Sequence, residues 1–323
     1  MKPIIIGVDT GNRCIKTVHN VFVSGINKQK AKPIQSKEVL KYNDEYYTLT
    51  KKRVNYLQDK TENDEYFALT LFGIAKELKF RGIKPSNEAI PILLGVGLPP
   101  SHLGLYKDKL KKYFERAFIK FNYEGESYKI QIQNVIVFSQ GYAAIFDDFQ
   151  QISTFDKSYI VDIGGYTTDV IQLNNGKIDT NVCQSINAGM IILYNKIKDE
   201  LENKYGIAPD ENQIDHIMAT GIEINPKYPM VDIINQITTR YVEDLVSLLK
   251  EKGIILTFAK GIFIGGGSIR LKKWIDQNQE IYKPYYIDSI HANAKGYEAC
   301  LNAIQNQKKS GWYKCKLRKI KDD

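Results

Sequence analysis

The chain has 323 residues, of which 43% are hydrophobic and 25% charged, and its net charge is +8. This near-average composition excludes a disordered or fibrous protein, and no apolar run reaches the roughly 18 residues that a membrane helix needs. Four cysteines and four histidines follow no metal-ligand spacing, so we predict neither a disulfide framework nor a zinc site. The length favours two domains, and the short apolar start favours a cytoplasmic protein.

In the first half, the chain opens with a predicted hairpin, IIIGVDTGNRCIK, in which a strand ends at Asp9 and a return strand ends at Lys16. Helical spacing of apolar residues predicts a helix in TENDEYFALTLFGIAKEL. A buried strand, AIPILLGVGLP, stops at two prolines and is followed by an amphipathic helix, LGLYKDKLKKYFERAF. Alternation predicts strands in SYKIQIQNVIVF, and SQGYAAIFDDF is predicted to be a helix that begins at Ser139.

The second half opens with a buried strand and a second predicted hairpin, SYIVDIGGYTTDV. Asn175-Gly176 predicts a hairpin turn in VIQLNNGKID, and a strand NVCQSI comes next. After Gly189 we predict a long helix that ends at Gly206, then two further helices. A strand, three glycines and a helix follow in KGIFIGGGSIRLKKWI, and HANAKGYEACLNAI is predicted to be a closing helix.

The two predicted hairpins repeat one pattern, since Lys16 follows Asp9 by the same interval as Asp169 follows Asp162. In each copy a strand delivers a carboxylate, and a glycine turn beyond it exposes backbone N–H groups. Such turns bind anions, and an adjacent carboxylate can hold hydrated magnesium. Two copies together predict a phosphate clamp, in which Lys16 is a cation for phosphate and Thr167 or Thr168 donates a hydroxyl.

Structural alternatives remain for several of these residues. An ordinary strand-ending turn explains a single copy of the pattern, and Asp169 either contacts magnesium or ties the hairpin together. Gly265, Gly266 and Gly267 form a glycine-rich loop before a predicted helix, which suits a nucleotide. Neither a GxGxxG pattern nor a GxxxxGK[ST] loop occurs, so neither a Rossmann oxidoreductase nor a P-loop NTPase is favoured.

Taken in order, these motifs resemble the actin, Hsp70 and sugar-kinase superfamily over nearly the whole chain. DTGNRCIK is similar to its first phosphate motif, VFSQGYAAIF to its first connecting segment and VDIGGYTTDV to its second phosphate motif. FIGGGSIRL is similar to the adenosine motif, and ANAKGYEA to the second connecting helix. The short length and GVGLPPSHLGLYKDKL most resemble the plasmid-segregating bacterial actins of the ParM type and their archaeal relatives.

This resemblance implies an α/β fold with two actin-like (ribonuclease H-like) domains that flank a nucleotide cleft. Residues 1–155 with 291–323 would carry the first phosphate loop, and residues 156–290 the second loop and the adenosine motif. It also implies an ATPase that binds ATP or ADP with Mg²⁺ and polymerises into filaments, with a DNA-binding adaptor protein and plasmid DNA as partners. No membrane partner is expected.

The site residues that the resemblance implies fall into five groups. Asp9 and Asp162 would organise magnesium through water, while Gly11, Asn12 and Lys16 would hold phosphates. Gly164, Gly165, Thr167 and Gly189 would close the other side, and Gly265, Gly266 and Gly267 would lie at the nucleoside. Gln140 stands where the family carries the residue that positions the attacking water; the best-known plasmid segregators have Glu there. Taken alone, Gln140 is better explained as a polar surface residue at the start of a helix, and its place in the ordered set of motifs favours the site instead.

Two other functions compete with the filament-forming ATPase. A small-molecule kinase of the same superfamily needs a general base and a sugar-sized pocket, and no motif for either is evident. A nucleotide-bound scaffold would polymerise or bind partners without useful hydrolysis. An Hsp70 chaperone is disfavoured because no peptide-binding domain follows the predicted cleft.

The net charge is concentrated at the end of the chain. Residues from Lys308 onward contribute +5 of the +8, so the body offers no dedicated DNA surface by charge alone. Direct contact of this tail with nucleic acid is the less favoured reading. Trp312 and Tyr313 within it indicate that part of the tail packs against the protein or a neighbouring subunit.

Overall fold

The structure is a computed structural model that describes residues 2–34 and 37–309. The basic tail from residue 310 onward, including Trp312 and Tyr313, lies outside the described residues, so its role stays a prediction. The chain divides into two compact units. The first consists of Met1–Phe149 with the segment that begins at His291, and the second of Gln150–Ile290. Residues 150–155, which the sequence analysis assigned to the first domain, fall in the second unit.

The first unit is built on a nine-stranded sheet with the order β3-β2-β1-β7-β9-β8-β5-β6-β4. Its strands are β1 (Ile4–Thr10), β2 (Cys14–Lys16), β3 (Val21–Val23), β4 (Ile26–Gln29), β5 (Val39–Tyr42), β6 (Glu45–Leu49), β7 (Ile90–Leu98), β8 (Ile119–Tyr123) and β9 (Glu126–Ser139). All residues of β7 are buried, as the unbroken apolar run predicts for a central parallel strand.

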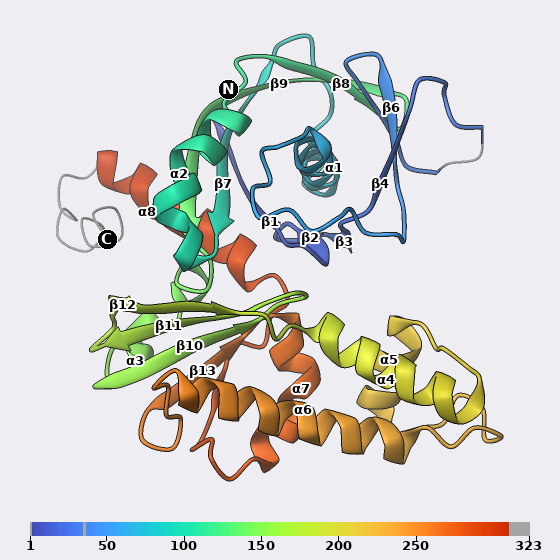
Figure 1. Cartoon of the computed structure of the whole chain (residues 1–323). Helices are drawn as coiled ribbons and strands as arrows, with labels where there is room; N and C mark the ends of the chain where they lie inside the picture. Colours follow the sequence, from blue (N-terminus) through green and yellow to red (C-terminus); the bar gives the residue numbers. More distant parts are fainter. Residues whose placement is uncertain (1, 35–36, 310–323) are drawn as a thin grey trace. The chain divides into compact units, whose positions relative to one another are not determined.

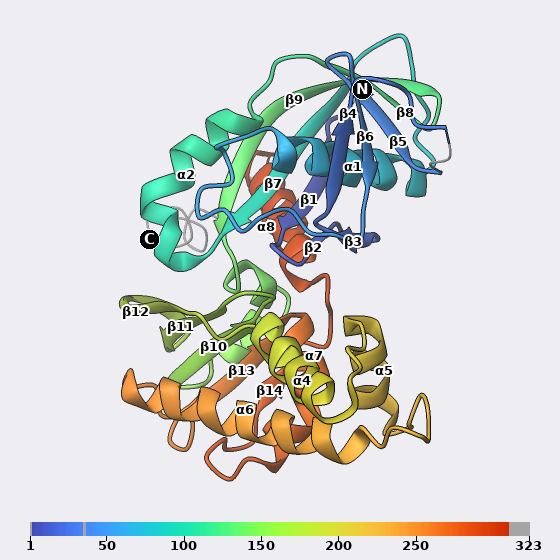
Figure 2. The ribbon, with the colours of Figure 1, turned by 45° about the vertical axis from the view of Figure 1, so that its right-hand side comes forward.

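Two helices cover opposite faces of this sheet at β1. They are α1 (Glu65–Phe80) and α8 (Ala292–Lys309), and Figure 2 shows both beside β1 and β7. Neighbouring residues of a strand point to opposite faces. Val8 lies near Gly73 of α1, whereas a Cβ on Gly7 would overlap the carbonyl of Ala294 in α8. The glycine therefore lets α8 approach the backbone of β1. The third long helix, α2 (Pro100–Phe114), follows β7 directly.

The second unit has a five-stranded sheet with the order β12-β11-β10-β13-β14. Its strands are β10 (Lys157–Ile163), β11 (Thr168–Asn174), β12 (Lys177–Ile186), β13 (Lys260–Ile264) and β14 (Tyr285–Tyr286). Its helices are α4 (Met190–Tyr205), α5 (Glu211–Thr220), α6 (Val231–Glu251) and α7 (Gly265–Gln277), while α3 (Phe149–Ile152) lies at the start of the unit. Alternate residues of β10 (Tyr159, Val161 and Ile163) join the apolar core under α4, α6 and α7 (Figure 1).

The repeat predicted from the sequence is confirmed by the strand topology. In each unit a first strand, β1 or β10, pairs antiparallel with the strand that follows it and parallel with a strand much later in the chain. The registers also agree, because Asp9 lies opposite Lys16 and Asp162 lies opposite Asp169. Both units therefore contain the same local framework around their aspartates.

The predicted elements differ from the structure at three places. Residues after Ser139 do not form the predicted helix: Gly141 takes a positive φ of 77°, which interrupts it, and only a short 3₁₀ helix, η1 (Ala143–Ile145), follows. The predicted return strand after the Asn175-Gly176 turn and the predicted strand NVCQSI form one strand, β12. Its pairing with β11 shifts register between Val170 and Gln172. The three glycines form the first turn of α7 instead of a separate loop.

None of the described helices has both the length and the apolar character needed to cross a membrane.

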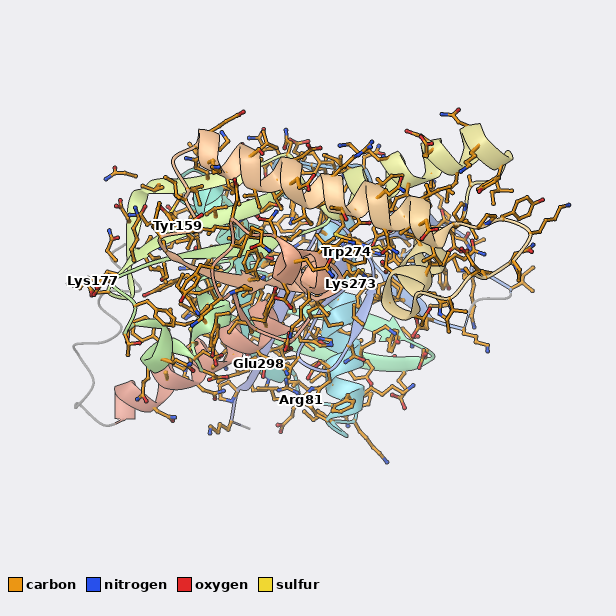
Figure 3. The ribbon with its side chains drawn as sticks, turned by 90° about the horizontal axis from the view of Figure 1, so that it is seen from below. Arg81, Tyr159, Lys177, Lys273, Trp274 and Glu298 are labelled. Atoms are coloured by element: carbon orange, nitrogen blue, oxygen red, sulfur yellow. The ribbon has the colours of Figure 1, made fainter. Side chains whose placement is uncertain are left out.

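A buried carboxylate holds the helices of the first unit around β1. Glu77 of α1 is fully buried and accepts hydrogen bonds from Thr17 Oγ1 at 2.6 Å and Arg81 Nε at 2.9 Å. Its Oε1 lies 2.5 Å from His19 Nδ1. Arg81 also donates to Glu298 of α8 at 2.6 Å, and Figure 3 shows these two side chains close together. These donors lower the pKa of Glu77 to about 2, although burial alone would raise it.

We predict that Glu77→Gln destabilises the protein by about 3 kcal/mol at neutral pH, because it removes the charge to which these donors are matched. Urea denaturation measures the effect. Glu124→Gln is the matched control, since the Glu124–Lys79 ion pair lies at the surface and should contribute less than about 1 kcal/mol. Equal effects of the two substitutions would contradict the prediction.

The same contact predicts a pH dependence. The pKa of Glu77 is lower in the folded state than its ordinary value of 4.5, so its contribution to stability is complete above that pH. The contribution should be lost as the pH falls from 4.5 towards about 2. The difference in stability between the unaltered protein and Glu77→Gln should therefore narrow over this range. A difference that stays constant would show that folding does not lower the pKa of Glu77.

Candidate functional site: two glycine turns beside buried aspartates

The first turn connects β1 to β2 and carries Asp9, Gly11, Asn12 and Lys16. Asp9 is the last but one residue of β1 and is only 4% exposed. Lys16 faces it across the hairpin, with Nζ at 3.3 Å from Asp9 Oδ2. A Cβ on Gly11 would lie 2.7 Å from the carbonyl oxygen of Cys14, so the tightness of the turn requires glycine here. The predicted cation and the predicted metal-organising carboxylate are therefore direct neighbours.

Gln140 directly follows strand β9 and reaches the same aspartate. Its Nε2 donates to Asp9 Oδ1 at 3.2 Å, and the residue is 8% exposed. Because β7 lies between β1 and β9, the side chain of Gln140 has to cross it, and it does so at Gly97. A Cβ on Gly97 would lie 3.0 Å from Gln140 Cγ. The structure thus places Gln140 in the buried group around Asp9 and not on the surface.

Asn293 holds the segment that follows Gln140 and was missed in the sequence analysis. Its Oδ1 accepts a hydrogen bond from the N–H of Gly141 at 2.8 Å, and the contact is buried. A Cβ on Gly296 would overlap the carbonyl of Ala143, so α8 also packs closely on η1. The motif ANAKGYEA marked this helix, but only the contact of Asn293 with a distant backbone amide reveals its role. Asn293 therefore positions Gln140 indirectly.

The second turn connects β10 to β11 and carries Gly164, Gly165 and Thr167. The N-terminal end of α4 lies against it. The N–H of Met190 donates to the carbonyl of Gly164 at 3.0 Å, and that of Ile191 donates to Gly165 at 2.9 Å. Gly189 is in contact with the turn, since a Cβ there would lie 2.5 Å from the carbonyl carbon of Gly165. Asp162, 9% exposed, precedes this turn as Asp9 precedes the first.

Two polar residues at the start of β11, next to the second turn, link this strand to β12 and the segment after it. Thr168 is fully buried, and its Oγ1 donates to the carbonyl of Ala188 at 2.6 Å. Asp169 accepts from Ser185 Oγ at 2.5 Å and from Thr167 Oγ1 at 3.3 Å. Of the two readings of Asp169, these contacts favour the structural one. Of the two candidate hydroxyl groups, Thr167 is the less buried, because it stands at the turn itself.

The three glycines that begin α7 have different surroundings. Gly265 has a positive φ of 86°, and a Cβ there would overlap Asp162 Oδ1 and lie 3.0 Å from the carbonyl oxygen of Ile163. A Cβ on Gly267 would lie 2.6 Å from the same oxygen, so this glycine is required for packing against β10. Gly266 is more open, with only Arg270 Nη1 at 3.1 Å and Ile290 Cγ2 at 4.0 Å. Of the three, Gly266 offers the most room for a ligand.

The donor atoms present fit a magnesium ion held through water. Within residues 2–34 and 37–309, no group of three or more His, Cys, Asp or Glu side chains could hold a metal ion directly. Magnesium keeps several of its waters in proteins and is often bound by only one or two carboxylates. Both oxygens of Asp9 accept a hydrogen bond, and an ionised carboxylate has lone pairs for about four such contacts. Asp9 therefore has capacity for a metal-bound water.

The structure brings Asp9, Lys16 and Gln140 together in the first unit. In the second unit it brings Asp162, Gly165 and Gly265 together, along with Gly164, Thr167, Gly189 and the two further glycines of α7. Each unit thus places a buried aspartate beside a glycine turn, with at least one group of donors at that turn.

Two family descriptions match the sequence, one in each unit. Residues 7–142 match the family "Actin like proteins N terminal domain". Residues 160–277 match the family "Archaeal actin homologue MreB-like, C-terminal". No curated protein matches the sequence.

Solved structures of actin homologues resemble the chain over almost all of its length. Ta0583, an archaeal actin homologue, has a TM-score of 0.77 at 17% identity, with 93% of this chain and 99% of that chain covered. A ParM from Clostridium botulinum, solved as a 15-stranded filament, has a TM-score of 0.72 at 20% identity, with 94% and 100% covered. Ta0583 in complex with ADP has a TM-score of 0.70 at 18% identity, with 93% and 99% covered. These likenesses confirm the predicted α/β fold of the actin type.

We predict opposite effects for two neighbouring alanine substitutions in α7. Gly267→Ala should lower stability by about 2 kcal/mol, because the new methyl group meets the backbone of β10. Gly266→Ala should leave stability unchanged or raise it by up to about 1 kcal/mol, since only the end of the Arg270 side chain lies near. Thermal denaturation of both variants checks the difference. A loss of stability in Gly266→Ala as large as that in Gly267→Ala would contradict the packing seen here.

Proposed function

Since the chain belongs to the actin-like superfamily, we propose that it is an ATPase that binds ATP with Mg²⁺ and assembles into filaments. The observation that carries this proposal is the duplicated hairpin, in which Asp9 and Asp162 occupy the same register position beside a glycine turn. A fold alone does not define an activity, whereas two matching anion-binding turns with adjacent carboxylates favour a ligand that has several phosphates and a metal ion.

The proposal gives each residue a chemical role. Asp9 and Asp162 would hold magnesium through its waters, and the ion would neutralise phosphate charge. Lys16 and the amides of Gly11 and Asn12 bind phosphate oxygens, while the glycine turn of the second unit offers further amides. Gly266 leaves room for the nucleoside at the start of α7.

Gln140 has the role of orienting the attacking water. An amide is not a strong base, so it acts by holding the water with its oxygen and nitrogen and not by removing a proton. The hydrogen bond from its Nε2 to Asp9 supports this role, because it fixes the amide and leaves the side-chain oxygen to accept from water. The presence of Gln instead of Glu at this position favours orientation of the water over removal of its proton.

The proposals on filament assembly and DNA segregation rest on the solved structures that resemble this chain. The ParM of Clostridium botulinum was solved as a filament, and we propose that this chain also forms a homopolymer. We further propose that the filament segregates plasmid DNA in the cytoplasm through a DNA-binding adaptor protein. Such a function needs assembly that depends on the bound nucleotide.

Light scattering at 90° with and without Mg-ATP, followed by negative-stain imaging, tests the proposal. Filaments that form with Mg-ATP and release of ADP without an added acceptor support it. Release of ADP only when a small-molecule acceptor is added would favour a kinase. Filaments that form with ATP bound but not hydrolysed would favour a scaffold.

We predict that Gln140→Ala lowers ATP turnover about 100-fold while nucleotide affinity stays the same, because the residue acts after binding. Its filaments should persist longer than those of the unaltered protein. Phosphate release and nucleotide titration measure the two effects. Gln133→Ala, which alters an exposed glutamine of β9, the strand that ends just before Gln140, is the control. A loss of affinity with unchanged turnover of the bound nucleotide would place Gln140 in binding instead.

We predict that Asp162→Asn weakens the response to magnesium about 10–100-fold, since the amide no longer attracts the metal-bound waters. Asparagine is preferred to alanine because it keeps the shape that packs beside Gly265. Turnover measured over a range of Mg²⁺ concentrations gives the shift. Asp156→Asn, an exposed aspartate just before β10, should match the unaltered protein. An unchanged magnesium dependence in Asp162→Asn would remove this residue from the metal site.

A further inference from the structure

Lys60 is a buried lysine that neither the motifs nor the proposed function uses. It lies between β6 and α1 and is only 8% exposed. Its Nζ donates a hydrogen bond to the backbone carbonyl of Thr10, and it lies 5.1 Å from the ring centre of Tyr66. A lysine is rarely buried to this extent unless its charge is compensated. The carbonyl and the aromatic face supply that compensation at the base of the first glycine turn.

Lys60 is one of three side chains that hold consecutive residues of this turn. Ser24 Oγ donates to the carbonyl of Gly11 at 2.5 Å, and Tyr66 Oη donates to Asn12 Oδ1 at 2.9 Å. Thr10, Gly11 and Asn12 therefore each accept a hydrogen bond from a side chain elsewhere in the first unit. Lys60 is the charged member of this set.

Holding a carbonyl determines the direction of the next amide. In a trans peptide, the C=O of one residue and the N–H of the following residue point in opposite directions. The bond from Lys60 to Thr10 thus directs the N–H of Gly11 away from Lys60, and the bond from Ser24 to Gly11 does the same for the N–H of Asn12. Carbonyl oxygens repel anions, so the same bonds keep them turned away from a phosphate that binds to these amides.

The second unit achieves the same arrangement with helix ends. When Asp9 is aligned with Asp162, Thr10 corresponds to Ile163 and Gly11 to Gly164. The carbonyl of Gly164 accepts from the first turn of α4, and that of Ile163 lies against the first turn of α7. Both helix ends carry partial positive charge. The equivalent carbonyls of Thr10 and Ile163 therefore both face positive groups.

Among its described residues, the first unit has no equivalent glycine-rich helix start. The helix that follows β7 is α2, the counterpart of α7 after β13, but it begins at Pro100 after Pro99. Proline has no N–H to donate. Lys60 lies near this helix, since its neighbour Asp59 forms an ion pair with Lys109 of α2. Burial, together with the positive charge of Lys60, lowers the pKa of His102 in the first turn of α2. The ammonium group of Lys60 thus contacts the carbonyl of Thr10, whereas in the second unit the start of α7 lies against the equivalent carbonyl of Ile163.

We propose that Lys60 positions the first glycine turn for phosphate binding, by tying back the carbonyl of Thr10 and placing a buried positive charge behind the turn. This inference rests on the proposed binding of a nucleotide. It concerns the phosphates of the nucleotide and not its nucleoside, because Lys60 directs the amide of Gly11, which is proposed to bind phosphate.

Binding of ATP, ADP and adenosine to the full chain, measured by calorimetry with Mg²⁺ for Lys60→Met, tests the inference. The Kd for ATP and ADP should rise at least about tenfold, while the Kd for adenosine stays unchanged. Ser24→Ala should shift the Kd for ATP in the same direction by about threefold, since it removes a neutral hydrogen bond. Lys79→Met, which removes a surface lysine of the same unit, should change neither. Thermal denaturation of each variant shows whether it is folded.

The outcomes separate this inference from the proposed function. Unchanged affinity of Lys60→Met for ATP, or an equal loss for ATP and adenosine, would overturn the role of Lys60 while the proposed function stands. If Lys60→Met does not fold, Ser24→Ala decides, and ATP affinity equal to that of the unaltered protein would overturn the inference. No binding of any nucleotide by the unaltered protein would overturn the proposed function and this inference together.

Discussion

The pairing of β1 with β2 sets Asp9 opposite Lys16, and the pairing of β10 with β11 sets Asp162 opposite Asp169. A shift by one residue in either hairpin would turn the aspartate to the other face of its sheet. The tight turns beyond the aspartates depend on the same register, because their glycines lie in close contact with backbone atoms. Backbone pairing therefore sets the positions of the carboxylate, the turn and the surrounding donors together.

Packing around these hairpins differs between the units although the strand order is the same. In the second unit, the helix ends of α4 and α7 lie directly against the turn and the strand before it. In the first unit, Lys60, Ser24 and Tyr66 hold the turn with side chains. A single substitution can remove one of these side chains, but it cannot remove a helix end. Substitution can therefore adjust the first turn more easily than the second.

Hydrogen bonds to the buried carboxylate of Glu77 also connect the elements of the first unit around β1. It joins α1 to the residues that follow β2, and Arg81 extends the contact to Glu298 of α8. Glu298 in turn accepts from the N–H of Gly7 in β1 at 3.0 Å. Because β1 ends at the candidate site, this network fixes the strand that carries Asp9 on both of its faces.

The sequence by itself determined the two hairpins, their equal spacing and the positions of Asp9 and Asp162, because local residue patterns indicate where strands end and where glycine turns form. It also predicted the fold type through motifs in a fixed order. It failed at residues 139–149, where Gly141 adopts a left-handed conformation that no local pattern indicated. Only the tertiary structure decided that Gln140 crosses β7 to Asp9, that Asn293 holds Gly141, and that Lys60 lies behind the first turn. These contacts join residues far apart in the chain, and their geometry depends on how strands and helices pack, which local sequence does not encode.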